Sequence, residues 1–235
     1  MKCFLILSLS LIMLSSCRRQ SAGTELVTLN ELTIEVYDTS RELGYTNKLA
    51  GFYYTESNNE QSSGWQGWHV MSKKILDDYA IAIDGKDLRR LDVQLALVDP
   101  HQFTRSYKIG VQETVTLLDS VNGLVVELAK VKGSAVTIRP LFTESQDSGD
   151  YIVNCVGSSA FIAKRNHPRR TPKEDYPAWI GISIIGSESR AVSETFVRDH
   201  RFAPVSVEAP ATDGNVAAIL VAGDTMEETE SLLGN

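Results

Sequence analysis

The chain has 235 residues, of which 43% are hydrophobic and 23% are charged, a balance that excludes a disordered chain, a collagen-like repeat and a protein with several membrane spans. Its 30 acidic residues outnumber its 23 basic residues and give a formal net charge of -7, which argues against a nucleic-acid-binding protein with a basic face. Three cysteines in this length exclude a small domain held by many disulfides, so we expect one domain with a hydrophobic core of its own.

The N-terminus predicts an export signal over residues 1–16. Lys2 supplies a positive charge, and residues 4–14 form an apolar run that is shorter than the roughly 20 residues of a membrane span. The run leads into Leu14-Ser15-Ser16-Cys17, which resembles the lipobox of bacterial lipoproteins. The resemblance implies that Cys17 is lipidated and becomes the mature N-terminus. An ordinary signal peptide with a chance cysteine is the alternative.

A lipidated Cys17 predicts a cell-envelope protein that is lipid-anchored at the outer membrane or at its periplasmic face. Several acyl chains on one residue hold a protein firmly, whereas a single chain binds a membrane only weakly. Residues 17–24 then form a flexible tether. Cys155 is the one thiol left in the mature chain, and its apolar neighbours predict a small core residue rather than a nucleophile.

Residues 25–223 predict an all-β fold, a large antiparallel β-sandwich, because short β-branched segments alternate with turns. The expected strands cover residues 26–37, 79–84, 91–98, 111–119, 124–131, 135–142, 151–156, 159–164, 179–185 and 216–222. Asn122-Gly123 lies between two of these segments and predicts a hairpin. The short link at residues 132–134 predicts that the next strand continues the same meander.

The last residues, 224–235, predict the start of a linker helix. Thr225 and Glu228 have the spacing of a capping box, and acidic residues fill the first turn, where the helix dipole favours negative charge. A helix of this length is only marginally stable in isolation.

Compact catalytic signatures are absent from the sequence. There is no GxSxG, SxxK, HExxH, GxxxxGK[ST] or CxxC motif, and the four histidines stand alone. Turn chemistry explains the acidic pair Asp77-Asp78. We therefore predict no catalytic residue, no metal site and no cofactor.

Four aromatic residues are the candidates for ligand binding. Tyr53 and Tyr54 stand before the polar loop at residues 55–64, and Trp65 and Trp68 follow it. Flat rings stack on sugar faces while neighbouring Asn, Gln, Glu and Asp side chains bond the hydroxyl groups, so the segment predicts a carbohydrate site. Packing within the sandwich is the alternative, because aromatic residues dominate the cores of β proteins.

Six segments of the chain point to a known family. They are YTNKLAGFYY (45–54), GWQGW (64–68), ILDDY (75–79), VDPHQFTRSY (98–107), QETV (112–115) and IRPLF (138–142). Together they resemble the N-terminal domain of bacterial glycogen-debranching-type glycosidases, which are amylo-α-1,6-glucosidase-like enzymes. The resemblance covers residues 43–142 well and the remainder loosely, and its motifs mark the domain rather than a reaction.

The resemblance implies a β-supersandwich that packs on an (α/α)6 helical barrel, with the catalytic acid and base in the barrel. No residue of this chain matches those carboxylates, so we expect a carbohydrate-related lipoprotein that is inactive alone. The alternatives are a free-standing α-glucan-binding surface lipoprotein and a docking module for a separately encoded catalytic domain. The expected partners are an α-glucan or oligosaccharide, a helical catalytic domain and the membrane that holds the lipid anchor, and no nucleic acid.

Overall fold

A computed structural model describes residues 28–60, 65–71, 73–133, 135–142, 151–164, 179–185, 189–193, 204–210 and 214–234. The chain divides after Leu32 into two compact units. The first unit is described only at residues 28–32, where the 3-10 helix η1 spans Leu29–Leu32. The predicted signal peptide, the lipidation site Cys17 and the tether lie outside the described residues, and their roles stay predictions.

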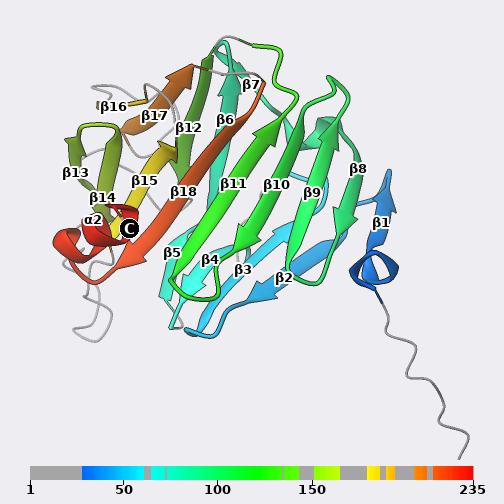
Figure 1. Ribbon diagram of the computed structural model, residues 1–235, viewed down its shortest axis with the longest axis horizontal. Coiled ribbons are helices and arrows are strands. Elements are labelled where there is room, and N and C mark those ends of the chain that lie inside the picture. The colour runs from blue at the N-terminus through cyan, green and yellow to red at the C-terminus, as the bar shows by residue number, and fades with distance from the viewer. Residues whose placement is uncertain are drawn as a thin grey trace, which may run out of the picture. The chain divides into compact units, whose positions relative to one another are not determined.

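The second unit is an all-β sandwich, as the sequence predicts, and its described strands form three antiparallel sheets. The nine-stranded sheet has the order β1 (Ile34–Tyr37), β8 (Val93–Val98), β9 (Gln102–Tyr107), β10 (Gln112–Leu117), β11 (Gly123–Ala129), β18 (Val216–Gly223), β15 (Trp179–Ile185), β14 (Ser159–Lys164) and β13 (Tyr151–Val156). Figure 1 shows the two smaller sheets behind this sheet.

The smaller sheets form the second layer of the sandwich. The five-stranded sheet has the order β16 (Arg190–Ser193), β17 (Val205–Pro210), β12 (Ala135–Leu141), β6 (Asp78–Ile83) and β7 (Lys86–Asp87). The four-stranded sheet has the order β2 (Glu42–Thr46), β3 (Gly51–Glu56), β4 (Gly67–Val70) and β5 (Lys73–Leu76). Two helices complete the described part of the unit, η2 (Arg90–Asp92) and α2 (Met226–Gly234).

The layers pack through alternate residues of their strands. On β9, Phe103, Arg105 and Tyr107 are buried while the residues between them are half-buried. On β3, every second residue from Gly51 to Thr55 is buried in the same way. The ring of Phe103 stacks on that of Tyr53 with centroids 6.3 Å apart, so the nine-stranded and four-stranded sheets meet face to face. Burial with a period of two is what strands of a sandwich require.

The predicted hairpin at Asn122-Gly123 is confirmed, but the predicted meander is wrong. β10 and β11 pair antiparallel, with Leu117 opposite Leu124. β11 uses its other edge to pair with β18. β12 crosses to the second layer instead, where it pairs with β6 and β17. Strands of both layers show the same alternation, so a short link does not tell which layer the next strand joins.

The strand predicted over residues 26–37 is shorter than expected. Within the described residues, η1 occupies Leu29–Leu32, and β1 begins only at Ile34. The Glu31 carboxylate accepts the Thr28 amide N–H at 2.6 Å and the Thr28 hydroxyl at 2.9 Å. Local bonds of this kind offer the backbone an alternative to a strand.

The predicted C-terminal helix is confirmed as α2, together with its cap. The amide N–H of Glu228 donates to the Thr225 hydroxyl at 3.1 Å, and the amide N–H of Asp224 donates to the Glu228 carboxylate at 2.8 Å. α2 packs on β14, β15 and β18. A Cβ at Gly181 would lie 2.7 Å from Leu233 Cδ1, so glycine lets the helix come close to the sheet. This packing offsets the low intrinsic stability of so short a helix.

Candidate functional site

The four predicted aromatic residues do not share one surface. Tyr53 and Trp68 are 1% and 0% exposed, and they face each other in register across β3 and β4 inside the sandwich. Tyr54 lies half-buried on the opposite face of β3, and Trp65 is 81% exposed just before β4. Of the four, only Tyr54 and Trp65 reach the surface. The binding role itself stays a prediction.

Tyr54 lies on the outward face of the four-stranded sheet. We call this surface the outer platform, formed by Glu42, Phe52, Tyr54, Glu56 and the adjoining Trp65. Tyr54 pairs in register with Gly44 on one side and with Gly67 on the other, so no side chain of either neighbour covers its ring. The Tyr54 hydroxyl donates a hydrogen bond to Glu42, which raises the pKa of Tyr54 to about 12 and keeps its hydroxyl protonated.

Glu56 is the most firmly positioned carboxylate of the outer platform. It accepts the Ser40 hydroxyl at 2.5 Å and the side-chain amides of Asn59 at 3.1 Å and Gln66 at 2.5 Å. The bond from Ser40 is the largest influence on the pKa of Glu56, and the three bonds together lower that pKa although burial opposes them. Glu56 is therefore an ionised, rigid acceptor at neutral pH.

His69 links Trp65 to the outer platform. The imidazole ring of His69 stacks on Phe52, with centroids 4.3 Å apart and planes inclined by 8°. Its Nε2 lies 3.2 Å from the carbonyl oxygen of Trp65, at hydrogen-bond distance. Burial lowers the pKa of His69, so the imidazole is neutral at pH 7 and donates to this carbonyl through Nε2–H. The backbone that carries the exposed Trp65 ring is thereby fixed against the same face as Phe52.

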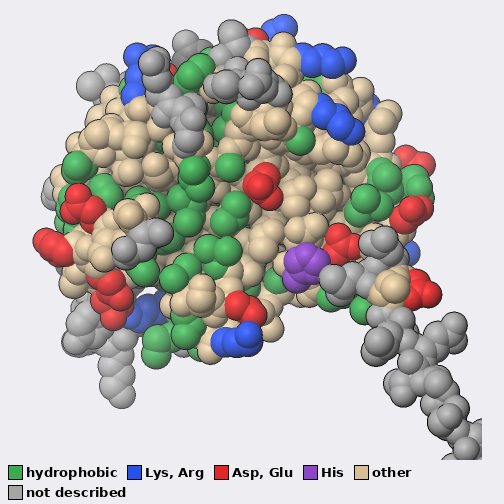
Figure 2. All heavy atoms as spheres, in the orientation of Figure 1, with side chains coloured by type: hydrophobic (Ala, Val, Ile, Leu, Met, Phe, Trp, Pro, Cys, Tyr) green, Lys and Arg blue, Asp and Glu red, His purple; other side chains and the backbone are tan. Residues whose placement is uncertain are grey.

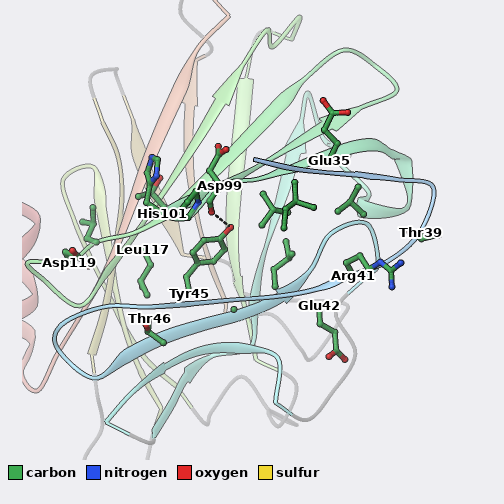
Figure 3. Close-up of a pocket in the computed structure, with 18 of the residues that line it drawn as sticks. Glu35, Thr39, Arg41, Glu42, Tyr45, Thr46, Asp99, His101, Leu117 and Asp119 are labelled. Carbon is green, nitrogen blue, oxygen red and sulfur yellow. Dashed lines mark hydrogen bonds between the residues drawn. The ribbon is translucent and has the colours of Figure 1, made fainter. Parts of the chain in front are cut away.

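A cleft opens between β1 of the nine-stranded sheet and β2 of the four-stranded sheet (Figure 3). We call it the edge cleft, and its volume is about 1140 Å³. The close-up places Thr39 and Arg41 at one end, and His101 and Asp119 at the other. Its aliphatic lining residues are Ile34, Val36, Leu43, Val98, Leu117 and Leu118. The edge cleft therefore combines an aliphatic interior with polar ends.

Tyr45 lies in the middle of the edge cleft, beside Asp99 (Figure 3). Its hydroxyl donates to the carbonyl oxygens of Gln102 at 2.8 Å and of Asp99 at 3.1 Å. Burial, helped by the negative charge of Asp99, raises the pKa of Tyr45 to about 12. Tyr45 is thus a neutral donor with its proton already engaged, and it is not suited to act as a general base.

Motif residues that carry the family resemblance meet in the interior of the sandwich. Arg105 of TRSY lies opposite Glu113 of QETV, with Nη1 and Oε2 3.2 Å apart. Glu113 also accepts the hydroxyl groups of Tyr79 and Tyr107, each at 2.5 Å. All four residues are buried, and the Glu113 carboxylate binds the polar groups of the other three side chains. These four residues therefore hold the layers together and are too deeply buried to contact a ligand at the surface.

Two further sequence predictions are wrong. Asp78 is no turn residue, because it lies in β6 and forms a buried ion pair with Arg90, whose Nη2 is 2.5 Å from Asp78 Oδ1. Cys155 is exposed on β13 instead of lying in the core. Partial burial still raises the pKa of its thiol, which keeps it protonated at neutral pH.

The described residues contain no group of three or more His, Cys, Asp or Glu side chains that is placed to hold a metal ion. Within the same part of the chain, no helix has the length and apolar character needed to cross a membrane.

No known protein-family model matches the chain, and no curated protein matches it. Among solved structures, the chain is similar to a family GH92 inverting mannosidase from Bacteroides thetaiotaomicron, with 9% identity, a TM-score of 0.40, and coverage of 66% of this chain and 22% of that one. A human-microbiome protein assigned as a kojibiose phosphorylase has 8% identity and a TM-score of 0.42, with coverage of 81% and 31%. A polysaccharide lyase has 9% identity and a TM-score of 0.31, with coverage of 66% and 26%. The chain spans between 22% and 31% of the length of these proteins.

Proposed function

We propose that this chain is a non-catalytic carbohydrate-binding module of the cell envelope, held to the membrane by a lipid on Cys17. The outer platform carries the proposal, because the half-buried ring of Tyr54 lies between two glycines with the carboxylates of Glu42 and Glu56 nearby. The resemblance of residues 43–142 to debranching-type glycosidases favours an α-glucan as the ligand.

The chemistry of a pyranose fits this surface. The faces of a sugar ring present C–H groups that pack on a flat aromatic ring, and its rim presents hydroxyls that donate to carboxylates. Tyr54 supplies a half-buried flat ring, Glu42 and Glu56 supply acceptors on the same face, and Trp65 supplies a ring that is 81% exposed. An open face also admits the middle of a long glycan, which a closed pocket would exclude.

Binding of maltoheptaose and glycogen to the full chain tests the proposal, by titration calorimetry and by affinity electrophoresis. We expect Tyr54→Ala and Trp65→Ala each to weaken binding about fivefold, since one aromatic contact is worth about 1 kcal/mol. The matched control is Tyr37→Ala, because Tyr37 is 55% exposed on β1, away from the outer platform. Lack of binding by the wild type, or an equal loss in the control, would remove the proposal.

A second candidate function is docking of a separately encoded helical catalytic domain. A strip of apolar side chains on the outward face of the nine-stranded sheet favours it. Val125 of β11 and Ile219 of β18 are paired and half-buried there, and Ile185 of β15 is 53% exposed. Figure 2 shows hydrophobic side chains gathered over this part of the face. Ile219→Lys should abolish co-purification with such a domain and leave glycan binding unchanged.

Neither candidate gives the chain hydrolytic activity of its own. General acid–base catalysis contributes about 10²–10⁴-fold to a hydrolysis rate, and the family resemblance implies that this machinery belongs to the barrel. The full chain should therefore release no product from aryl α-glucosides or α-glucans above a buffer blank. Release above the blank would contradict the non-catalytic assignment.

A further inference from the structure

We propose that the edge cleft binds the carboxylate of a long aliphatic chain, with the hydrocarbon along the aliphatic lining and the carboxylate at Arg41. The proposal is independent of glycan binding at the outer platform. The buried Leu43 lines the cleft from the inward face of β2, whereas Tyr54 lies on the outward face of the sheet. Two ligands can therefore be tested separately.

Arg41 supplies an unpaired positive charge at one end of the cleft. In the part of the chain that the structure describes, no carboxylate lies within ion-pair distance of its guanidinium. Two acidic residues of the lining, Glu35 and Glu42, point away from the space between β1 and β2 (Figure 3). Glu35 accepts the Tyr37 hydroxyl at 2.7 Å, and Glu42 accepts the hydroxyl of Tyr54.

The other two carboxylates of the lining already have partners. Asp99 accepts the Thr33 hydroxyl at 2.5 Å, and Asp119 pairs with Lys48 at 2.9 Å. An anionic group that binds at Arg41 therefore gains a charge-assisted contact without breaking an existing ion pair. Arg41 is the one Lys or Arg side chain among the lining residues, and it is therefore the contact that we assign to an anion.

The interior of the cleft favours a hydrocarbon chain over a sugar. Leu43 and Leu117 are buried at 7% and 8% exposure, whereas Ile34 remains 61% exposed and gains from being covered. Tyr45 has its hydroxyl committed to the Gln102 carbonyl, so it offers no free donor to a sugar hydroxyl. A saccharide would bury hydroxyls against aliphatic side chains at a cost in free energy, whereas an acyl chain would bury none.

Titration of the full chain with cis-parinaric acid, a fluorescent fatty acid, tests the proposal, with stearate and octadecanol as competitors of equal chain length. We expect saturable binding and displacement by stearate about fivefold more effective than by octadecanol, as expected for one exposed charge pair. Arg41→Gln should remove this difference, because it leaves only the hydrocarbon contribution. Ile34→Ser should weaken binding of both competitors, and it changes an exposed side chain that folding does not require.

Arg190→Gln is the matched control, since Arg190 is an exposed arginine of the five-stranded sheet outside the cleft. It should bind as the wild type does. All four proteins share the apolar N-terminal run, so differences between them report on the cleft. The proposal is overturned if the wild type binds no probe, if octadecanol competes as well as stearate, or if Arg190→Gln weakens binding as much as Arg41→Gln. Full displacement by an acidic oligosaccharide, with none by stearate, would assign the cleft to sugars instead.

Discussion

Arg105 and Glu113 face each other across β9 and β10, with Nη1 and Oε2 3.2 Å apart and neither side chain more than 1% exposed. The same guanidinium donates through Nε to the Ser57 carbonyl at 2.9 Å and through Nη2 to the Thr55 hydroxyl at 3.0 Å. Glu113 in turn accepts the hydroxyl of Tyr79 on β6. One buried ion pair thus joins all three sheets.

Removing the cation of this pair should destabilise the fold strongly. Arg105→Met leaves the Glu113 carboxylate buried without its ion partner, which costs about 3–5 kcal/mol of the free energy of unfolding. Urea unfolding followed by tryptophan fluorescence measures the loss. Arg190→Met, at an arginine whose side chain is 74% exposed, is the control and should change stability by less than about 1 kcal/mol. A loss at Arg105 no larger than in the control would contradict the role of the pair.

The two partners should also prove energetically coupled. The double variant Arg105→Met, Glu113→Met leaves no buried charge, so it should lose less stability than the two single variants do together. Additive losses would mean that the ion pair makes no contribution beyond that of its separate members.

Stability should fall at acid pH because of Glu113. Burial alone raises the pKa of this carboxyl, but the Arg105 and Arg90 guanidinium groups and the hydroxyls of Tyr107 and Tyr79 outweigh burial and hold the pKa below its usual 4.5. Because the pKa of Glu113 is lower in the folded state than in the unfolded chain, the ionised carboxylate stabilises the fold above pH 4.5. This contribution is lost as the pH falls through the pKa of the folded state. Urea unfolding between pH 7 and pH 3 should show the decline. In Glu113→Gln the decline should be shallower, and an identical slope would exclude Glu113 as its source.

Stability should also fall at alkaline pH because of Tyr53. Burial, with the nearby Asp78 charge, raises the pKa of Tyr53 from 10.0 to about 12. Because the pKa is higher in the folded state, Tyr53 stabilises the fold fully below pH 10, and this contribution is lost as the pH rises toward 12. A shift of this size corresponds to about 3 kcal/mol. Unfolding at pH 8 and pH 11 should show a smaller loss in Tyr53→Phe than in the wild type. An equal loss would mean that other groups dominate the alkaline transition.

Alanine at Gly181 should detach α2. The added Cβ would lie 2.7 Å from Leu233 Cδ1 and 2.8 Å from Thr229 Cγ2, closer than packed atoms allow. Hydrogen exchange should then be faster in α2 and unchanged in β9 and β10. Gly44→Ala is the control, since its Cβ would meet Tyr54 at an ordinary 3.6 Å. Unchanged exchange in α2 of Gly181→Ala would show that the helix tolerates a wider separation from the sheet.

Features that depend on neighbours in sequence could be predicted, and those that depend on distant partners could not. The Asn122-Gly123 hairpin and the Thr225 cap are local, so their residues alone specify them. The layer of β12 depends on β6 and β17, which are far away in sequence and show the same alternation. No local pattern distinguishes the two layers.

The candidate site also shows this difference between features that depend on neighbours in sequence and features that depend on distant partners. Strand periodicity alone places Tyr53 and Tyr54 on opposite faces of their strand. Which of the two faces inward depends on where the nine-stranded sheet lies. The edge cleft gave no sequence signal, because its lining comes from separate segments between Ile34 and Asp119, and the motifs among them mark the domain rather than a site. Burial of Asp78 was equally hidden, since its partner Arg90 lies outside the ILDDY segment.

The position of β18 has a consequence for how the protein is made. β18 pairs with β11 on one edge and with β15 on the other, so it joins two groups of strands that otherwise do not touch within this sheet. A nascent chain that lacks β18 therefore carries two half-sheets, each with an open edge prone to wrong pairing. Assembly of this sheet must wait until β18 has been synthesised, and pairing over such sequence distances is slow. A chaperone that shields the edges of β11 and β15 during this interval would raise the yield of native protein.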